Sequence, residues 1–331
     1  MDMTTRYLGL ELKNPIVPSA SPLSKSLDTA KKLEDAGASA LVMYSLFEEE
    51  VDIDDARFAD MMDQGIGNSE ASSYLPPDYT EACHVDRYLT QLSVLKENLG
   101  IPIIASLNGI SSGGWMEHAL ELEQTGADAL ELNVYHVAAD IEESGSEVED
   151  RYVDLLRSLK KRISIPITMK LSPQFSSPGH MVKRLQSAGA DGVSLFNRFY
   201  QPEIDLDTLY VKHSLNLSTS NDALLAMRWI AILHGRVDLS LAATGGIHTC
   251  EDAVKMLLAG ADVCHMAAAL LQQGAQQITT VLTGVEEWME DNEYESIEQL
   301  KGSVSQQHAS NPAAFERANY ISMLENYSPR K

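Results

Sequence analysis

Cysteine is scarce in this chain. Three of the 331 residues are cysteines, Cys83, Cys250 and Cys264, and no two of them form a Cys-x-x-Cys pair. Three scattered thiols cannot build a paired disulfide framework, and they cannot supply the four ligands of an iron–sulfur cluster. We therefore expect a protein of a reducing compartment, the cytoplasm, that holds no such cluster by itself.

Long apolar runs and positive charge are lacking as well. No apolar run approaches the length of a membrane span, and the segment from Met1 to Arg6 has no apolar core of a signal peptide. The chain has 25 Lys and Arg against 48 Asp and Glu, a formal net charge of −23. Because this negative charge repels nucleic acid and anionic membranes, we expect neither as a partner. It also repels anionic ligands, so local donors must capture any bound anion.

A joint between helix and strand recurs along the chain. A helix-like segment ends in Gly-Ala, a small or acidic residue follows, and an apolar strand begins; the copies start at Gly37, Gly126, Gly189 and Gly260. Glycine can end a helix in the left-handed conformation, which explains its place. Other strands begin with Asn-Pro or Ile-Pro, where proline costs no ladder hydrogen bond. The expected strands are residues 15–20, 39–45, 102–108, 128–134, 166–171, 191–197, 239–244 and 262–267.

Eight strands that alternate with helices predict an α/β fold, the (β/α)8 TIM barrel. An open doubly wound sheet is the alternative, although it rarely shows eight such even units. The alternating segment from Tyr7 to Leu12 predicts an N-terminal hairpin that plugs the barrel bottom. A long insertion after strand 2, about residues 46–100, and C-terminal helices, about residues 272–331, complete one domain of residues 1–331. The acidic run Glu48 to Glu50 in the insertion is interpreted as a solvated face, and no metal site is expected.

Two stretches with small residues end the last two strands. Thr244-Gly245-Gly246 ends strand 7, and Ala267-Ala268 follows strand 8. Glycines free the backbone to turn N–H groups toward one point, and small residues let another backbone approach closely. This is the arrangement that the phosphate site of a TIM barrel requires after strands 7 and 8.

Polar residues at the other strand ends should face the same mouth, because active sites of TIM barrels lie there. Lys170 stands in an apolar strand, where a lysine is costly unless an anion or a covalent partner meets it. Two functional roles are open, to stabilise an anionic group of a cofactor or to form a Schiff base with a carbonyl substrate, and the structural alternative is a lysine that snorkels at the barrel rim. Asn108, Asn133 and Asn197 end strands 3, 4 and 6. Their amides both donate and accept, which suits a planar heterocycle.

The sequence resembles the dihydroorotate dehydrogenase family of FMN-dependent barrels over most of its length, except the segment after strand 2. The matching stretches are Asn14-Pro15-Ile16-Val17 with Ala20-Ser21, Ser106-Leu107-Asn108-Gly109, Gly126 through Asn133, Met169-Lys170-Leu171-Ser172-Pro173, Thr244-Gly245-Gly246-Ile247, and the tail from Trp288 to Gly302.

The resemblance implies roles for these residues. Lys170 would lie near the pyrimidine side of FMN and favour its reduced, anionic form. Asn197 would bind the substrate ring together with Asn108 and Asn133. The residues that would line the flavin are Ala20, Ser21, Ser45, Asn108 and Asn133, and those at its phosphate are Thr244, Gly245, Gly246, Ala267 and Ala268.

Four positions depart from the family pattern. His136 stands where the family has the cysteine or serine that removes a proton from the dihydro ring, and a histidine can serve as that base or be an ordinary loop residue. Tyr44 replaces a lysine that contacts flavin and substrate, and Arg198 can supply a compensating cation for a carboxylate. Ala267-Ala268 replaces Gly-Thr, which removes a hydroxyl from the phosphate site.

The leading prediction is an FMN-dependent oxidoreductase that acts on a CH–CH bond of a dihydropyrimidine such as dihydroorotate, with His136 and Lys170 as catalytic residues. The alternatives are a flavin-free, phosphate-binding barrel that uses Lys170 as a Schiff-base nucleophile, and an FMN-binding homologue that has lost dihydroorotate activity. The electron acceptor is expected to be soluble, for example fumarate, and a homodimer is expected from the resemblance.

Overall fold

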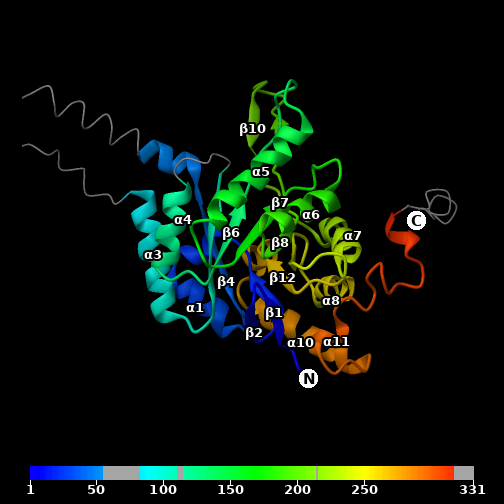
Figure 1. Cartoon of the computed structure of the whole chain (residues 1–331). Coiled ribbons are helices and arrows are strands. Elements are labelled where there is room, and N and C mark those ends of the chain that lie inside the picture. Colours follow the sequence, from blue (N-terminus) through cyan, green and yellow to red (C-terminus); the bar gives the residue numbers. More distant parts are fainter. Residues whose placement is uncertain (55–82, 110–114, 214, 317–331) are drawn as a thin grey trace, which may run out of the picture.

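Eight parallel strands form the centre of the protein in the computed structural model, which describes residues 1–54, 83–109, 115–213 and 215–316 (Figure 1). The order in the sheet is β3-β12-β11-β8-β7-β6-β5-β4. The two end strands approach each other, because Ser39 donates its backbone N–H to the carbonyl oxygen of Ile16 at 3.1 Å. The predicted TIM barrel is therefore confirmed as a nearly closed barrel. Its strands are β3 (Ile16–Pro18), β4 (Leu41–Phe47), β5 (Ile103–Asn108), β6 (Ala129–Asn133), β7 (Ile167–Leu171), β8 (Gly192–Leu195), β11 (Ser240–Thr244) and β12 (Val263–Met266).

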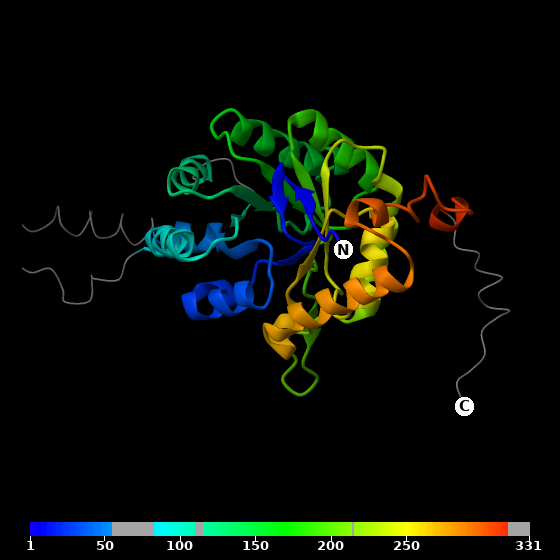
Figure 2. The same ribbon diagram turned by 90° about the horizontal axis from the view of Figure 1, so that it is seen from below.

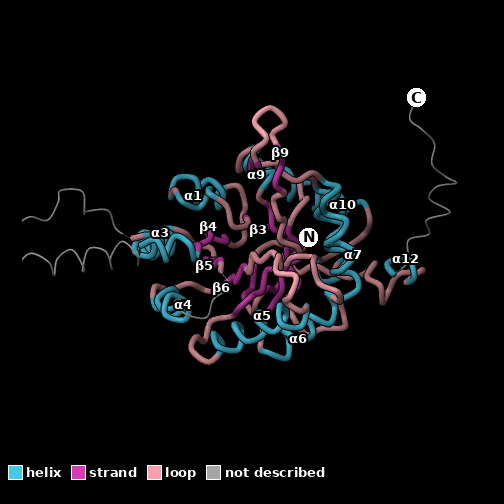
Figure 3. The backbone as a smooth tube through the Cα atoms, turned by 90° about the horizontal axis from the view of Figure 1, so that it is seen from above, coloured by secondary structure: helices cyan, strands magenta, loops and turns pink. Residues whose placement is uncertain are grey.

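Helices surround the strands, as the view from above shows (Figure 3). They follow the strands in the chain, so each strand leads outward to a helix and back. The barrel helices are α1 (Leu27–Asp35), α3 (His84–Asn98), α4 (Trp115–Gln124), α5 (Gly145–Lys160), α6 (Pro178–Ala188), α7 (Ala223–Leu233) and α8 (Cys250–Ala259). Short 3-10 turns, η1 (Pro22–Lys25) and η2 (Ser220–Asp222), precede α1 and α7. After β12 come α9 (Ala268–Gln273), α10 (Gln276–Asp291), α11 (Ile297–Leu300) and α12 (Ala313–Glu316).

The repeated Gly-Ala joint has a second function beyond ending the helices. Its glycines have positive φ angles, between +100° at Gly189 and +118° at Gly260. In three copies the next residue is an aspartate, and its Oδ2 accepts the N–H of a residue at the start of the neighbouring strand, at 2.7–2.8 Å. A lysine pairs with each of these aspartates. The joint therefore sets the start of the strands as well as the end of the helices. The aspartates are Asp128, Asp191 and Asp262.

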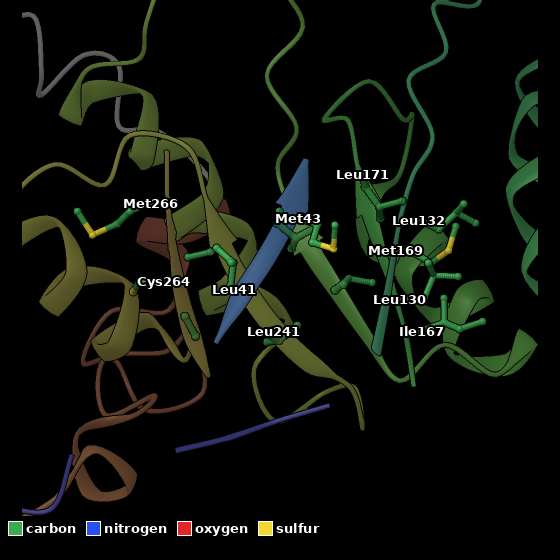
Figure 4. Close-up of a cluster of buried hydrophobic side chains, with 14 of the residues drawn as sticks. Leu41, Met43, Leu130, Leu132, Ile167, Met169, Leu171, Leu241, Cys264 and Met266 are labelled. Atoms are coloured by element: carbon green, nitrogen blue, oxygen red, sulfur yellow. The ribbon is translucent and has the colours of Figure 1, made fainter. Parts of the chain in front are cut away.

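The strands have an apolar outer side and an inner side of mixed character, on which an apolar cluster with the N-terminal residues Tyr7, Leu8 and Leu12 is found beside buried polar side chains. Figure 4 shows outward side chains from several strands, such as Leu130 and Ile167, in the cluster between barrel and helices. On the inner side of β6 and β7 stand Glu131 and Lys170, which are 0% and 7% exposed. The strands are thus buried on both faces, as expected of parallel strands with helices outside, but the inner face carries the chemistry.

A hairpin closes one end of the barrel. β1 (Thr5–Tyr7) and β2 (Leu10–Leu12) pair antiparallel, and the view from below shows them across the barrel at the start of its strands (Figure 2). Tyr7 and Leu8 are buried, and the backbone N–H of Leu8 donates to Ser240 Oγ at 2.9 Å. The predicted N-terminal hairpin is therefore confirmed.

The opposite end carries a second hairpin that the sequence reasoning missed, β9 (Pro202–Ile204) with β10 (Val211–His213). The predicted insertion, residues 46–100, includes the end of β4, a helical segment at 48–54 and the barrel helix α3. Its remaining part, residues 55–82, lies outside the described residues. Among the described helices, none combines the length and apolar character needed to cross a bilayer.

Candidate active site

A cavity of about 590 Å³ opens at the carboxyl ends of the barrel strands. This volume lies in the range of small-molecule and cofactor sites. Every site residue predicted from the sequence lines it, except His136. The predicted residues in its wall are Ala20, Ser21, Ser45, Asn108, Asn133, Lys170, Asn197, Arg198, Thr244, Gly245, Gly246, Ala267 and Ala268.

The turn after β11 lets two glycines face the cavity. Gly245 and Gly246 have φ angles of +88° and +76°, which side chains rarely tolerate. A Cβ on Gly246 would lie 2.3 Å from the backbone nitrogen of Ala223, so this position has no room for a side chain. Thr249 then caps α8, and its Oγ1 accepts the N–H of Asp252 at 3.4 Å. The turn is thus fixed between two helix starts, next to Ala267 and Ala268 in the same wall.

The Lys170 ammonium stands at the cavity wall against a buried acid. Its Nζ lies 3.3 Å from Glu131 Oε1, and Ser194 donates its hydroxyl to Glu131 Oε2 at 3.3 Å. The ring of His265 lies 3.9 Å from Glu131 Oε2, and no protein group bonds either ring nitrogen in the described residues. Burial lowers the pKa of His265 to about 4; the Glu131 charge opposes this shift and the Lys170 charge adds to it. Glu131 thus holds the Lys170 amine in a buried ion pair.

The three predicted asparagines converge on the cavity. Asn108 and Asn133 are partners in the register of β5 and β6. Asn197 Nδ2 donates to Asn133 Oδ1 at 2.7 Å. Below them, the hydroxyls of Ser45 and Ser106 lie 2.9 Å apart and cross-link β4 to β5. The amides therefore form one patch of donors and acceptors on the cavity wall.

His136 does not line the cavity. Its Nε2 lies 3.2 Å from Arg151 Nη1 and 3.6 Å from Glu143 Oε2, and Arg151 also pairs with Glu143. Partial burial, and secondarily the Arg151 charge, lowers the pKa of His136. The neighbouring side chain, Tyr135, lines the cavity instead, and its ring lies 4.0 Å from the ring of Phe199.

Tyr44, which departs from the family pattern, and Arg198, its predicted compensating cation, differ in place. Tyr44 is half-buried and is not part of the cavity wall; its ring contacts that of Tyr88, and Lys25 Nζ lies 4.9 Å above it. Arg198 does line the cavity, and its Nη1 donates to the carbonyl oxygen of Asn216 at 2.7 Å. The sequence reasoning missed further residues of the wall, which are Ser19, Pro22, Phe47, Tyr135, Phe196, Tyr200, Leu215, Leu217, Ser218, Ile247, His265 and Leu271.

Comparison with known proteins agrees with this geometry. The family model described as dihydroorotate dehydrogenase matches residues 80–289. The catalytic subunit of dihydroorotate dehydrogenase B (NAD(+)) of Thermoplasma acidophilum is 25% identical over 91% of this chain and 98% of its own length. Dihydroorotate dehydrogenase A (fumarate) of Lactobacillus delbrueckii subsp. bulgaricus is 27% identical, over 79% and 85%. The NAD-dependent dihydropyrimidine dehydrogenase subunit PreA of Escherichia coli is 23% identical, over 91% and 76%. The chain belongs to the dihydroorotate dehydrogenase family of oxidoreductases.

Proposed function

We propose that this protein is an FMN-dependent oxidoreductase that interconverts a C–C single and double bond in a dihydropyrimidine ring, with dihydroorotate as the first candidate substrate. One observation carries the proposal: Lys170, the asparagine patch and the Gly245-Gly246 turn share the wall of one cavity. Each of these features suits a different part of a flavin nucleotide and its substrate.

The residues present fit FMN. The Gly245-Gly246 turn lies in the cavity wall with positive φ angles, and its backbone N–H groups are the proposed donors to the phosphate. The Asn108 and Asn133 amides match the alternating N–H and C=O groups of a flavin ring, and Lys170 supplies a cation. When bound, FMN would supply the site that accepts or gives a hydride.

Substrate binding is proposed for the outer part of the cavity. Asn197, held by Asn133 at 2.7 Å, can donate to or accept from the ring of a dihydropyrimidine. Arg198 can pair with a carboxylate such as that of orotate. A carboxylate so bound is neutralised locally, as the acidic surface of the protein requires.

A proton must also leave or reach the ring carbon next to the one that exchanges the hydride. His136 is engaged by Glu143 and Arg151 outside the cavity, so we assign this proton to the Tyr135 hydroxyl, which belongs to the same loop and lies in the wall. A phenol is a stronger donor than acceptor at neutral pH. Tyr135 therefore suits the direction in which a double bond is reduced.

A soluble acceptor such as fumarate is proposed for the return of electrons. The relative in Lactobacillus delbrueckii is named for fumarate, whereas the one in Thermoplasma acidophilum is named for NAD(+). Fumarate is a small dicarboxylate, so it can use the same Arg198 side of the cavity as a carboxylate substrate.

The test is binding of FMN by the purified protein, followed by anaerobic mixing with dihydroorotate, dihydrouracil and related rings. Loss of the flavin colour with one of these rings identifies the substrate. A protein that is colourless and has no affinity for FMN refutes the proposal. A yellow protein that none of the rings bleaches supports instead the homologue without dihydropyrimidine activity.

A further inference from the structure

A serine and a histidine from two different loops meet beside the glycine turn. Ser218 precedes η2, and His248 lies two residues after Gly246. Ser218 Oγ and His248 Nε2 are 3.1 Å apart, and the side chains are buried, with 8% and 9% of the residues exposed. Ser218 lines the cavity, whereas His248 stands behind it. The hydroxyl therefore lies between the imidazole and the cavity.

The surrounding contacts hold this pair in place. The backbone N–H of His248 donates to Asp252 Oδ2 at 3.0 Å, and its carbonyl oxygen accepts from Gln277 Nε2 at 2.7 Å. The Ser220 hydroxyl donates to the same Asp252 oxygen at 2.7 Å, which ties the Ser218 loop to α8. The backbone of His248 is thus held through both its N–H and its carbonyl group, and Ser218 contacts its ring.

The location links the pair to the phosphate end. Gly245, Gly246 and Ser218 share one cavity wall, and a Cβ on Gly246 would meet Ala223, the first residue of α7, which directly follows η2. Ala267 and Ala268, on the other side, have no side-chain donor. Ser218 therefore adds a hydroxyl to a wall in which Gly245, Gly246, Ala267 and Ala268 offer only backbone groups.

We propose that Ser218 donates its hydroxyl to the FMN phosphate and that His248, when protonated, supplies the positive charge behind it, so that the phosphate is held more tightly at low pH. This inference rests on the proposed function. The His248 Nε2–H donates to Ser218 Oγ, which leaves the hydroxyl hydrogen for a phosphate oxygen. Charge-assisted hydrogen bonds of this kind are about twice as strong as neutral ones.

Carboxylates from two elements lie near His248. Asp252 on α8 accepts its backbone N–H, and Asp222 at the end of η2 interacts with it electrostatically. Backbone hydrogen bonding from Thr219 is the main cause that lowers the pKa of Asp222, and the charges of Arg198 and His248 lower it further. Among the described residues, the charged neighbours on this side are thus these two carboxylates, one of which also interacts with Arg198.

The experiment compares FMN with riboflavin, which lacks the phosphate, on the wild-type protein and on four variants. The variants are Ser218→Ala, Ser218→Thr, His248→Gln and the control His180→Gln, which changes an exposed histidine on α6 outside the cavity wall. Dissociation constants are measured by flavin fluorescence at pH 6 and pH 8. The phosphate itself titrates near pH 6, so each affinity is expressed relative to the wild type at the same pH.

We expect His248→Gln to weaken FMN binding about tenfold at pH 6 and less than about threefold at pH 8, because a neutral histidine adds no charge. Ser218→Ala should weaken FMN binding about tenfold at pH 6. Riboflavin affinity should stay the same in every variant, which also shows that the cavity is folded. Ser218→Thr, which keeps the hydroxyl, should restore the preference for FMN.

Each outcome decides. If wild-type protein binds neither flavin, the proposed function fails and this inference fails with it. If FMN binds but neither Ser218→Ala nor His248→Gln changes its affinity relative to riboflavin, the inference alone is overturned. A loss in His248→Gln that is equal at both pH values leaves no part for a titrating imidazole and also overturns it.

Discussion

Removal of the Glu131 carboxylate gives the sharpest test of the barrel interior. In Glu131→Gln, the Lys170 ammonium loses its partner at 3.3 Å while it stays 7% exposed. Two unit charges at this distance attract by about 5 kcal/mol at an effective dielectric constant of about 20. The glutamine oxygen and water from the cavity recover part of this energy, so we expect the free energy of unfolding to fall by about 3 kcal/mol, as for other broken buried pairs.

The assay is urea unfolding of the wild type, Glu131→Gln, Lys170→Met and the double variant. Because the double variant leaves no charge unpaired, it should be more stable than Glu131→Gln, with a coupling energy of about 2 kcal/mol or more. A loss below about 1 kcal/mol in Glu131→Gln, together with a coupling energy near zero, would refute the reasoning. Lys170 would then be stabilised by the cavity and its water rather than by Glu131.

Three further predictions concern single-residue substitutions. Tyr135→Phe should slow the anaerobic reoxidation of reduced flavin by the unsaturated ring, the half-reaction in which the ring gains a proton, by about 10²-fold or more. His136→Ala should change this rate less than about threefold; stopped-flow absorbance measures both, and the opposite order would return the proton to the histidine. The pKa of His265 is about 4 in the folded protein, below its value in the unfolded chain. The stability that the protein gains from a neutral His265 is therefore fully present above about pH 6.5. Stability should therefore fall by about 3 kcal/mol as the pH drops from 6.5 to 4, and thermal unfolding of His265→Gln should show a shallower fall over this range. Gly246→Ala should lower the free energy of unfolding by more than about 2 kcal/mol and remove most of the FMN affinity. Gly9→Ala, with a similar φ of +79° and open space around it, should lower the free energy of unfolding by about 1 kcal/mol. Equal losses of stability would mean that the clash at Gly246 relaxes.

The barrel could be predicted from the sequence because its signals are local and repeated. Each Gly-Ala joint marks a helix end and a strand start within a few residues, and the fold then brings all strand ends to one mouth. This explains why Asn108, Asn133 and Lys170 were predicted to share a cavity from their positions at strand ends alone. The same topology places Gly245-Gly246 beside them.

The missed features depend on long-range contacts or on loop conformation. The pair Ser218 and His248 comes from separate loops with no common pattern. In the loop after β6, no periodicity indicates whether Tyr135 or His136 faces the cavity, so the family position alone pointed to His136. Glu131 was within a recognised motif, but its ion pair with Lys170 depends on the contact between two neighbouring strands.

The hairpin of β1 and β2 closes one end of the barrel. In the part of the chain that the structure describes, Tyr7 and Leu8 fill this end, so ligands enter and leave at the opposite end. Under the proposed chemistry, the electron donor and the electron acceptor therefore use the same entrance, one after the other. The oxidised ring must dissociate before the acceptor binds, so turnover alternates between two half-reactions, and an excess of either compound inhibits binding of the other.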